Sequence, residues 1–391
     1  MFEKDLESLK AMGADITTVE IKQQPDLWED AYQIYQDNKE AIEAFLADAR
    51  AMAAGRRVSV VFVGAGTSDY VGDTVAPYLR RPGVGDTEAY DFKPVASTDI
   101  VSAPYDYLRP EDPTILVSFA RSGNSPESLA AVQIARQIVK DVRFLNITCA
   151  PEGELARGCE GRDDSLSILI PRALDGGFAM TGSFSCMSLM TMLVFDQASD
   201  EQKKAWVEQI AAMGREVVER EDEIAGYLAD DFDRVTYLGS GSFTGLSQES
   251  QLKILELAHG LVATSWDSCM GYRHGPKSFV DEKTLVFVFV SNDAYTRQYD
   301  LDILHEIAGD GIAKRTIAIQ QDVEPAFEGE SFCFEGREAL PEGYLALPYI
   351  MVAQTIALLN SVRVGNTPDT PSPSGTVNRV VKGVIIHPLE A

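Results

Sequence analysis

Serines gather in one short segment, where an apolar, β-branched run gives way to a helical pattern. Ser122, Ser125 and Ser128 lie within seven residues. Gly123 lets the backbone approach a ligand closely, and Ser125 followed by Pro126 suits the start of a helix. Free backbone N–H groups, hydroxyls and the positive end of a helix dipole together form a cradle for phosphate. An ordinary capped turn is the alternative, because serines are common at helix caps.

A second polar turn follows the apolar run Val58–Val63. The segment 64–68 reads Gly-Ala-Gly-Thr-Ser, which resembles the start of a dinucleotide fingerprint. The third glycine of that fingerprint is replaced by Asp69, so no nicotinamide cofactor is expected. The hydroxyls of Thr67 and Ser68 can instead face a ligand at the carboxyl edge of a sheet. A tight turn without a ligand is the alternative.

Charged residues recur at helical spacing further along the chain. Glu249, Lys253 and Glu256 stand at i, i+4 and i+7, so they share one face of a helix. A surface ion pair is the plainer interpretation, and the spacing alone favours it. The functional interpretation makes Glu256 a general base, Lys253 a cation that tunes its pKa, and Glu249 an orienting group.

One histidine stands in an unusual context. His274 lies in the segment Arg-His-Gly-Pro-Lys at 273–277, between two cations. A lone histidine is more often structural than catalytic. The chain has four histidines, and no two of them stand at i and i+4, so no metal is expected. We find no Gly-x-Ser-x-Gly elbow of a serine hydrolase.

These residues must be positioned by alternating strands and helices. Short apolar runs followed by helical patterns are typical of βαβ units and a parallel sheet. The expected strands are Val58–Val63, Ile115–Phe119, Val142–Thr148, Leu166–Ile170, Val235–Leu238, Leu285–Val290 and Arg315–Ile319. The expected helices include 27–54, 181–197, a charged helix at Glu201–Leu228 and Gln248–Leu261.

The pattern repeats along the chain. The glycines that end corresponding strands, Gly64 and Gly239, are 175 positions apart (239 − 64), and Ser118 and Ser291 are 173 apart (291 − 118). A near-constant offset indicates a duplicated domain, although the second copy lacks the Ser-Gly loop. The predicted organisation is an N-terminal helical segment at 1–49, α/β domains at 50–200 and 201–365, and an extended tail at 366–391.

Composition limits the partners. The formal net charge of −26 repels phosphate backbones, so nucleic acid is not expected, and an anionic substrate must be attracted by local groups. The five cysteines are widely spaced and include no Cys-x-x-Cys pair, which favours free thiols in a reducing cytoplasm. No basic and apolar leader stands at the N-terminus. No apolar run approaches the ~20 residues that span a bilayer, so no membrane is expected.

Taken together, these pieces resemble the SIS (sugar isomerase) family over roughly residues 50–390. The turn at 66–68, the loop at 122–128, Glu249-xxx-Lys253-xx-Glu256 and His274-Gly-Pro occur in the order found in the isomerase half of glucosamine-6-phosphate synthase. The resemblance implies two flavodoxin-like parallel sheets, each flanked by helices in an αβα sandwich.

The resemblance also implies roles for individual residues. Glu256 would move a proton between C1 and C2 of the sugar, and Lys253 would lie beside the open-chain substrate. His274, from a neighbouring subunit, would open the sugar ring, and Glu249 would orient it. The implied substrate- and phosphate-binding residues are Gly66, Thr67, Ser68, Arg121, Ser122, Gly123, Asn124, Ser125, Ser128, Met180, Thr181, Arg379 and Lys382. The last two compete for one role, because that alignment is loose.

A closer resemblance is to the AgaS branch of the family, the galactosamine-6-phosphate deaminase/isomerases. It is carried by widely spaced motifs: Thr-Thr-Val-Glu-Ile at 17–21, Gln-Pro-Asp-Leu-Trp at 24–28, Phe-Ala-Met-Thr at 178–181, Gly-Tyr-Arg-His-Gly-Pro-Lys-Ser at 271–278 and Thr-Val-Asn-Arg-Val-Val at 376–381. One departure is Ala120, where the synthase has a serine that binds phosphate.

This branch implies an enzyme that converts galactosamine-6-phosphate to tagatose-6-phosphate and ammonia without a cofactor, and a place among the hydrolases as well as the isomerases. It also implies a homodimer or larger homo-oligomer with a shared active site. Two alternatives stay open. One is an aldose/ketose phosphate isomerase that releases no ammonia. The other is a regulatory phosphosugar-binding module, which the three carboxylate and histidine positions and the short N-terminal segment disfavour.

Overall fold

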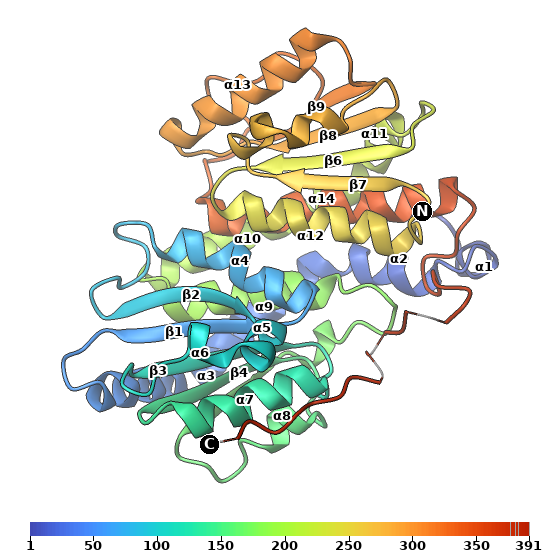
Figure 1. Cartoon of the computed structure of the whole chain (residues 1–391). Coiled ribbons are helices and arrows are strands. Elements are labelled where there is room, and N and C mark those ends of the chain that lie inside the picture. The colour runs from blue at the N-terminus through green and yellow to red at the C-terminus, as the bar shows by residue number, and fades with distance from the viewer. Residues whose placement is uncertain (376, 380, 382, 391) are drawn as a thin grey trace. The chain divides into compact units, whose positions relative to one another are not determined.

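The computed structural model describes residues 1–375, 377–379, 381 and 383–390, which form two five-stranded parallel sheets (Figure 1). The first sheet has the order β2-β1-β3-β4-β5 and the second the order β10-β9-β8-β6-β7. From its other edge, the second order becomes β7-β6-β8-β9-β10, which repeats the first strand for strand. Both are the flavodoxin-like order 2-1-3-4-5, so the predicted fold class and the duplication are confirmed.

The elements around the first sheet alternate as the sequence predicts. Its strands are β1 (Val58–Gly64), β2 (Tyr90–Ala96), β3 (Thr114–Ala120), β4 (Val142–Thr148) and β5 (Ser165–Leu169). Its helices are α3 (Gln24–Met52), α4 (Thr67–Leu79), α5 (Ser97–Ser102), α6 (Pro104–Tyr107), α7 (Pro126–Ile138), α8 (Glu154–Arg157) and α9 (Gly182–Phe195), with a 3-10 turn at Pro171–Ala173.

The second sheet repeats the alternation. Its strands are β6 (Arg234–Gly239), β7 (Ala263–Asp267), β8 (Thr284–Phe289), β9 (Arg315–Gln321) and β10 (Ser331–Phe334). The remaining helices are α1 (Leu6–Ala11), α2 (Asp15–Lys22), α10 (Asp200–Glu219), α11 (Glu221–Tyr227), α12 (Ser242–Leu257), α13 (Ala294–Asp310) and α14 (Glu342–Arg363), with 3-10 turns at Gly271–His274 and Pro276–Phe279. The expected single helix at Glu201–Leu228 is two, because Arg220 leaves helical geometry at φ −101° and ψ 24°.

Successive residues of a strand point to opposite faces of its sheet, and both faces of the first sheet are buried. Val61 and Val63 of β1 pack with α5 and α7 in one aliphatic cluster. Phe62, between them, packs on the other face with Phe92 of β2 and Phe195 of α9. Figure 1 shows α7 and α8 on the opposite side of this sheet from α4.

The second sheet is built in the same way. Val286 and Val288 of β8 pack with α13 in an aliphatic cluster. On the other face, Tyr237 of β6 stacks on Phe287 and Phe289, and Phe289 stacks on Tyr349 of α14. Tyr237 lies 175 positions after Phe62, so the duplication extends to the aromatic side chains inside the sheets.

The helix α14 departs from the expectation that no segment could span a membrane. Glu342–Arg363 is long and apolar enough by length and composition, with a mean hydropathy of 1.6 over its most apolar window. In the structure 89% of that window is buried inside the protein. The burial explains the composition, since a helix that is apolar all round suits a core as well as a membrane.

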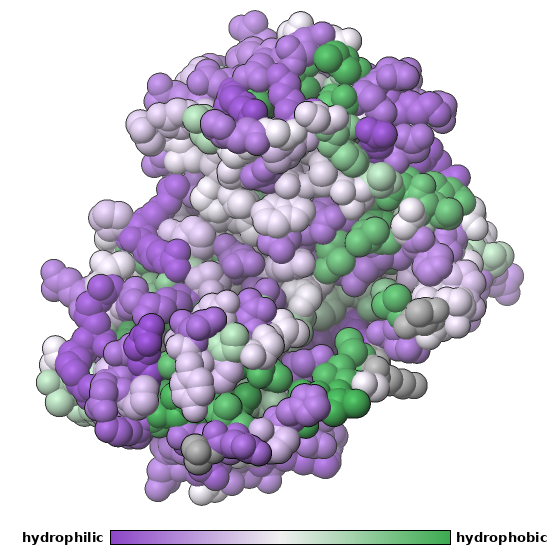
Figure 2. Space-filling view, in the orientation of Figure 1, coloured by the Kyte–Doolittle hydropathy of each residue, from purple (hydrophilic) through white to green (hydrophobic). Residues whose placement is uncertain are grey.

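The chain divides into two compact units, each holding one sheet. The first-sheet unit comprises Leu27–Asp175, Gly182–Lys204 and Val377–Ala391, and the second-sheet unit comprises Met1–Asp26, Gly176–Thr181 and Ala205–Thr376. The division into four segments, at 1–49, 50–200, 201–365 and 366–391, stays a prediction. The visible face of the molecule is mostly hydrophilic, with scattered apolar patches (Figure 2).

Candidate active site

Two turns that carry hydroxyl side chains lie at the carboxyl ends of neighbouring strands in the first sheet. In the order β2-β1-β3-β4-β5, the chain leaves β1 towards one side of the sheet and β3 towards the other. Open α/β sheets bind ligands at the carboxyl ends of strands where the order reverses in this way. The turn after Gly64 and the loop after Ala120 both begin there.

The first turn starts α4 under conformational constraint. Gly66 is the N-cap, at φ +58° and ψ −129°, a conformation that favours glycine. Thr67 and Ser68 then open the helix and are 5% and 6% exposed. The Ser68 N–H donates to the Ala65 carbonyl at 3.3 Å. The turn therefore holds both hydroxyl-bearing residues at the edge of the sheet.

An acidic residue follows immediately. Burial, and to a smaller extent the negative charges of Asp73 and Asp99, raise the pKa of Asp69 to about 7. Sequence reasoning used Asp69 only to exclude a dinucleotide. The structure adds that this carboxyl group, next to the predicted phosphate site, has a raised pKa.

The loop after β3 is the second phosphate candidate. Gly123 takes a left-handed conformation at φ +68°, and the Asn124 N–H donates to Ser122 Oγ at 3.3 Å. Ser125 is the N-cap of α7, yet its side chain makes no capping hydrogen bond. Because that hydroxyl is not used by the helix, both the hydroxyl and the positive end of the α7 dipole can serve an anion.

Ser128 lies one turn into α7 and is 4% exposed, so it belongs to the buried side of the loop. Its N–H donates to the Ser125 carbonyl at 3.1 Å, which closes the first turn of the helix. The structure therefore brings Ser122, Ser125 and Ser128 to one helix start, as their spacing predicts.

The loop is held from behind by α8. The Leu155 N–H donates to the Gly123 carbonyl at 3.0 Å, and the Glu154 N–H donates to Asn124 Oδ1 at 3.0 Å. Gly153 allows this approach, because a Cβ there would lie 2.5 Å from the Ser122 carbonyl oxygen. Sequence reasoning missed Gly153, and its only signal was a glycine in the polar segment after β4. The side-chain oxygen of Asn124 thus helps to shape the loop, and the contact of Asn124 with phosphate stays a prediction.

Arg121 holds the tail. It is 7% exposed, and its guanidinium donates to the carbonyl of Arg379 at 2.7 Å. The guanidinium of Arg379 in turn donates to the carbonyl of Asp175. Both arginines thus make backbone contacts within the first-sheet unit. Lys382, the competing tail residue, lies outside the described residues.

The charged trio belongs to the second-sheet unit, on α12. Glu249 and Lys253 are fully buried at 0% exposure, and the Glu256 side chain is 24% exposed. Lys253 Nζ lies 2.6 Å from Glu256 Oε2 and 3.4 Å from Glu249 Oε1. The expectation of an ion pair on the surface is therefore wrong, because Lys253 and Glu249 lie inside the protein.

The surroundings of Lys253 determine its charge. Burial acts to lower the pKa of Lys253, but the carboxylates of Glu249 and Glu256 raise it more, so the pKa lies above its ordinary value. Lys253 therefore stays an ammonium beside Glu256. A partly exposed carboxylate with a buried cation next to it is an arrangement that can accept and return a proton.

His274 ends a 3-10 turn of the second-sheet unit and is exposed. Arg273 and Lys277, which flank it, both bind Glu306 of α13, at 2.6 Å and 2.5 Å. Lys277 also lies 2.5 Å from Asp310. Both cations are thus paired with carboxylates of α13, whereas His274, which lies between them in the sequence, is exposed.

Met180 and Thr181 lie in the second-sheet unit, apart from the serine loop in the division of the chain. The segment is held by Glu20, whose carboxylate accepts the N–H groups of Gly176 and Gly177, the latter at 3.1 Å. Gln354 of α14 donates to the Thr181 carbonyl at 3.4 Å. The motif at 17–21 therefore positions the motif at 178–181, a link that sequence reasoning missed.

The comparisons with known proteins agree with one another. The D-galactosamine-6-phosphate deaminase AgaS of Escherichia coli is 40% identical over 381 residues, 96% of each chain. The protein of that name from Shewanella sp. (strain ANA-3) is 38% identical over 384 residues, 98% of this chain and 94% of the relative. The chain belongs to the AgaS family. No family model matches it.

Solved structures place this AgaS-family chain in the same fold. The tagatose-6-phosphate ketose/aldose isomerase of Escherichia coli has a TM-score of 0.85 at 37% identity, over 96% of this chain and 97% of that one. A glucosamine-6-phosphate deaminase of Thermotoga maritima has a TM-score of 0.67 at 21% identity, over 93% and 99%, and supports the fold alone. The predicted family is confirmed. The expected place among the hydrolases is wrong, since these relatives are named as deaminases and isomerases.

Proposed function

We propose that this protein converts D-galactosamine-6-phosphate to tagatose-6-phosphate and ammonia. The observation that carries the proposal is Lys253, buried on α12 and within 2.6 Å of the partly exposed carboxylate of Glu256. Relatives at 40% identity over 96% of the chain are named for the deamination, and a structure at 37% identity is named for the ketose/aldose isomerisation. The two reactions share one proton transfer, between C2 and C1.

The first-sheet unit supplies the binding of the phosphate. Ser68, Ser122 and Ser125 follow adjacent parallel strands, and the N-terminal ends of α4 and α7 add backbone N–H groups and dipoles. This way of binding an anion suits a chain with a net charge of −26, because it needs no large basic surface. Arg121 acts on the tail through its hydrogen bond to the Arg379 carbonyl, and the contacts of Arg379 and Lys382 with the sugar stay a prediction.

The chemistry is assigned to residues of α12 and to His274. Glu256 removes the proton from C2 of the open-chain amino aldehyde, and the resulting enolamine takes the proton back at C1. The ketimine at C2 then loses ammonia as water takes its place, which gives the ketose phosphate. Lys253 stabilises the negative charge that develops in the transition state. His274 opens the sugar ring from a second subunit of a homo-oligomer, and Glu249, which pairs with Lys253, is proposed to orient it.

The five cysteines are free thiols in the structure, which supports work in a reducing cytoplasm. The substrate is proposed to be the only partner besides further copies of the chain.

The decisive experiment measures ammonia release from galactosamine-6-phosphate, with glucosamine-6-phosphate in parallel. Ammonia from the galacto sugar alone is the expected result. The variant Glu256→Gln, which keeps the shape of the side chain, should still bind the sugar phosphate and should lose turnover by at least about 10²-fold, because a positioned general base contributes ~10²–10⁴. Retained turnover in Glu256→Gln would exclude this base.

A second candidate is isomerisation without ammonia release, favoured by the name of the structure at 37% identity. Interconversion of tagatose- and galactose-6-phosphate, with no ammonia from either amino sugar, would establish it. The assignment of Glu256 would then stand, since both reactions need the same base.

A further inference from the structure

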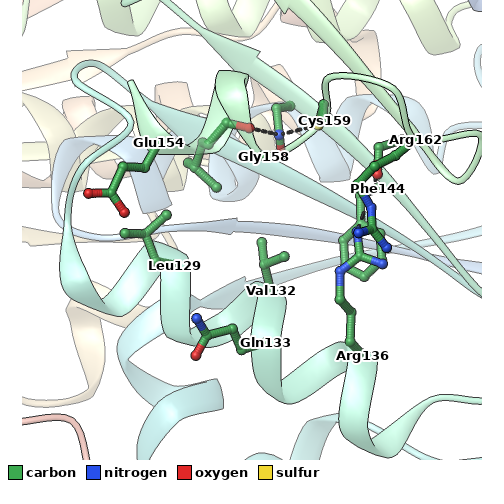
Figure 3. Close-up of a pocket in the computed structure, with 12 residues that line it drawn as sticks. Leu129, Val132, Gln133, Arg136, Phe144, Glu154, Gly158, Cys159 and Arg162 are labelled. Carbon is green, nitrogen blue, oxygen red and sulfur yellow. Dashed lines mark hydrogen bonds between the residues drawn. The ribbon is translucent and has the colours of Figure 1, made fainter. Parts of the chain in front are cut away.

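Two of the predicted substrate-binding loops are supported by different parts of the chain. In the first-sheet unit, α8 supports the serine loop through the N–H groups of Glu154, labelled in Figure 3, and Leu155. The segment 176–181, which carries Met180 and Thr181, belongs to the second-sheet unit, forms neither helix nor strand and begins with two glycines. Adjacent glycines leave the backbone free to take many conformations, so this segment is ordered by contacts from other segments.

The helix α2 supplies the contacts at the start of this segment. The Glu20 carboxylate accepts the N–H groups of Gly176 and Gly177, the latter at 3.1 Å. A Cβ on Gly177 would lie 2.9 Å from Glu20 Oε2 and 3.4 Å from Thr17 Oγ1, so the backbone runs directly against α2. Glu20 is 7% exposed and Thr17 is 1% exposed. The start of the segment is therefore held only as firmly as α2 itself.

The N-terminus of α2 receives its cap from a distant part of the chain. The N-cap residue, Ala14, makes no side-chain hydrogen bond. Asp369, in the segment after α14, takes this role, because its carboxylate accepts the N–H of Ile16 at 3.0 Å and both the N–H and the hydroxyl of Thr17 at 2.7 Å. The Asp369 N–H also donates to the Gly13 carbonyl at 2.8 Å. A carboxylate at this end of a helix pairs the first N–H groups and interacts favourably with the helix dipole.

We propose that Asp369 is a positioning residue for the binding of the sugar phosphate. By capping α2 it holds Glu20 in place, and Glu20 in turn orders the segment that carries Met180 and Thr181. The inference rests on the proposed function and on the predicted contact of these two residues with the substrate.

The expected consequence is a change in affinity without a change in chemistry. When the cap is removed, only a fraction of the molecules holds the segment 176–181 in its binding-competent arrangement, and the apparent affinity for the substrate falls by that fraction. Substrate at saturation selects the ordered arrangement, so the proton transfer at Glu256 keeps its rate. KM therefore rises and kcat stays the same.

The first test follows hydrogen exchange of the segment 176–181 by mass spectrometry, in the protein without substrate. Asp369→Ala should exchange about tenfold faster than the wild-type protein. Asp369→Asn should stay close to the wild-type protein, because asparagine is also a good N-cap. Asp5→Ala, which removes the carboxylate cap of α1, is the matched control and should leave this exchange unchanged.

The second test measures ammonia release from galactosamine-6-phosphate. Asp369→Ala should raise KM about tenfold and change kcat by less than about twofold, whereas Asp369→Asn and Asp5→Ala should change neither. Glu20→Gln, which replaces one acceptor oxygen by a donor, should also raise KM. The double variant of Asp369→Ala with Glu20→Gln should raise KM no further than Glu20→Gln alone, because Asp369 acts through Glu20.

Three results would overturn the inference: unchanged exchange in Asp369→Ala, faster exchange with an unchanged KM, or effects of the two substitutions that multiply in the double variant. A residue that only stabilises the fold would lower the unfolding temperature and leave KM of the folded enzyme unchanged. Failure of the proposed function gives a different result, which is no ammonia from the wild-type protein. Exchange in the substrate-free variants and calorimetric binding of tagatose-6-phosphate then decide the inference in place of KM.

Discussion

At the scale of single residues, the buried ammonium of Lys253 has the clearest energetic consequence. Substitution Lys253→Met leaves the fully buried Glu249 carboxylate without its cation. Removal of one partner of a buried pair costs about 3–5 kcal/mol, so we expect a loss of that size in the free energy of unfolding, measured with denaturant at pH 7. The double variant Lys253→Met with Glu249→Gln should recover part of the loss. Equal stability of the single variant and the wild-type protein would contradict this account.

The pH dependence of that contribution follows from its sign. The pKa of Lys253 is raised above 10.5 in the folded protein. A raised lysine pKa stabilises the fold fully below the unfolded value and loses that effect as pH rises through the folded value. The difference between the wild-type protein and Lys253→Met should therefore be constant across neutral pH and shrink only above about pH 10.5.

The charged form of Asp69, unlike that of Lys253, destabilises the folded protein. Its pKa is raised from 3.8 to about 7, so between these values the unfolded state loses the proton that the folded state keeps. Stability therefore falls as pH rises from about 4 to 7 and stays at the lower level above 7. Asp69→Asn removes this loss. We expect it to stabilise the protein at pH 8, measured by thermal unfolding, and to have no stabilising effect below pH 4. The same gain at both pH values would show that the carboxyl group titrates normally.

The sequence was sufficient to predict the hydroxyl-bearing residues of the candidate phosphate loop. It was insufficient to predict the residues that hold this loop in place. Hydroxyls at Ser122 and Ser125 are visible as a pattern, because helix starts have strong local preferences. The support given to that loop by Gly153 and α8 depends on packing between segments about 30 positions apart, which no local pattern contains. Burial of Lys253 was missed for the same reason, since i, i+4 spacing is identical on a surface helix and in a core.

At the scale of elements, the N-terminus of α9 is the feature most sensitive to one side chain. All residues of α9 are buried, so its first N–H groups cannot reach water. Asp175 accepts the N–H of Gly182 at 3.1 Å and that of Ser183 at 3.0 Å. Asp175→Ala should cost about 1–3 kcal/mol or more in unfolding free energy, measured with denaturant, because buried donors stay unpaired. Asp5→Ala, which removes the exposed cap of α1, is the matched control and should cost clearly less.

Two physical causes explain why the sequence did not predict three of the strands and one of the long helices. The strands β2, β7 and β10 lie at or next to sheet edges and carry mixed burial patterns, so their residues are not the continuous apolar runs of central strands. The helix α14 is buried all round, so it has no polar face and no 3.6-residue period. Central strands and amphipathic helices were predictable because each shows its own burial pattern locally.

At the scale of the whole molecule, net charge and substrate charge have the same sign. A chain with a net charge of −26 repels a sugar phosphate at long range, and salt screens that repulsion. If helix N-termini and hydroxyls hold the phosphate, KM should fall by about two- to threefold between 0.05 and 0.3 M salt, with kcat unchanged. Steady-state kinetics measures this directly. A KM that rises with salt would show that lysine and arginine side chains dominate phosphate binding.

The shared active site is the last property of the whole molecule that can be tested from single residues. His274 is exposed and is proposed to act in the site of a second copy, whereas Glu256 acts in the site of its own chain. The variants Glu256→Gln and His274→Asn should each be inactive. If a dimer forms, mixing and reassembling them in equal amounts makes half of the molecules heterodimers, and each heterodimer has one site with both defects and one with none. About a quarter of the wild-type ammonia release should therefore return. If both residues served one site from the same chain, every site in the mixture would carry one defect and no activity would return. Unmixed variants, taken through the same reassembly, separate this result from refolding alone.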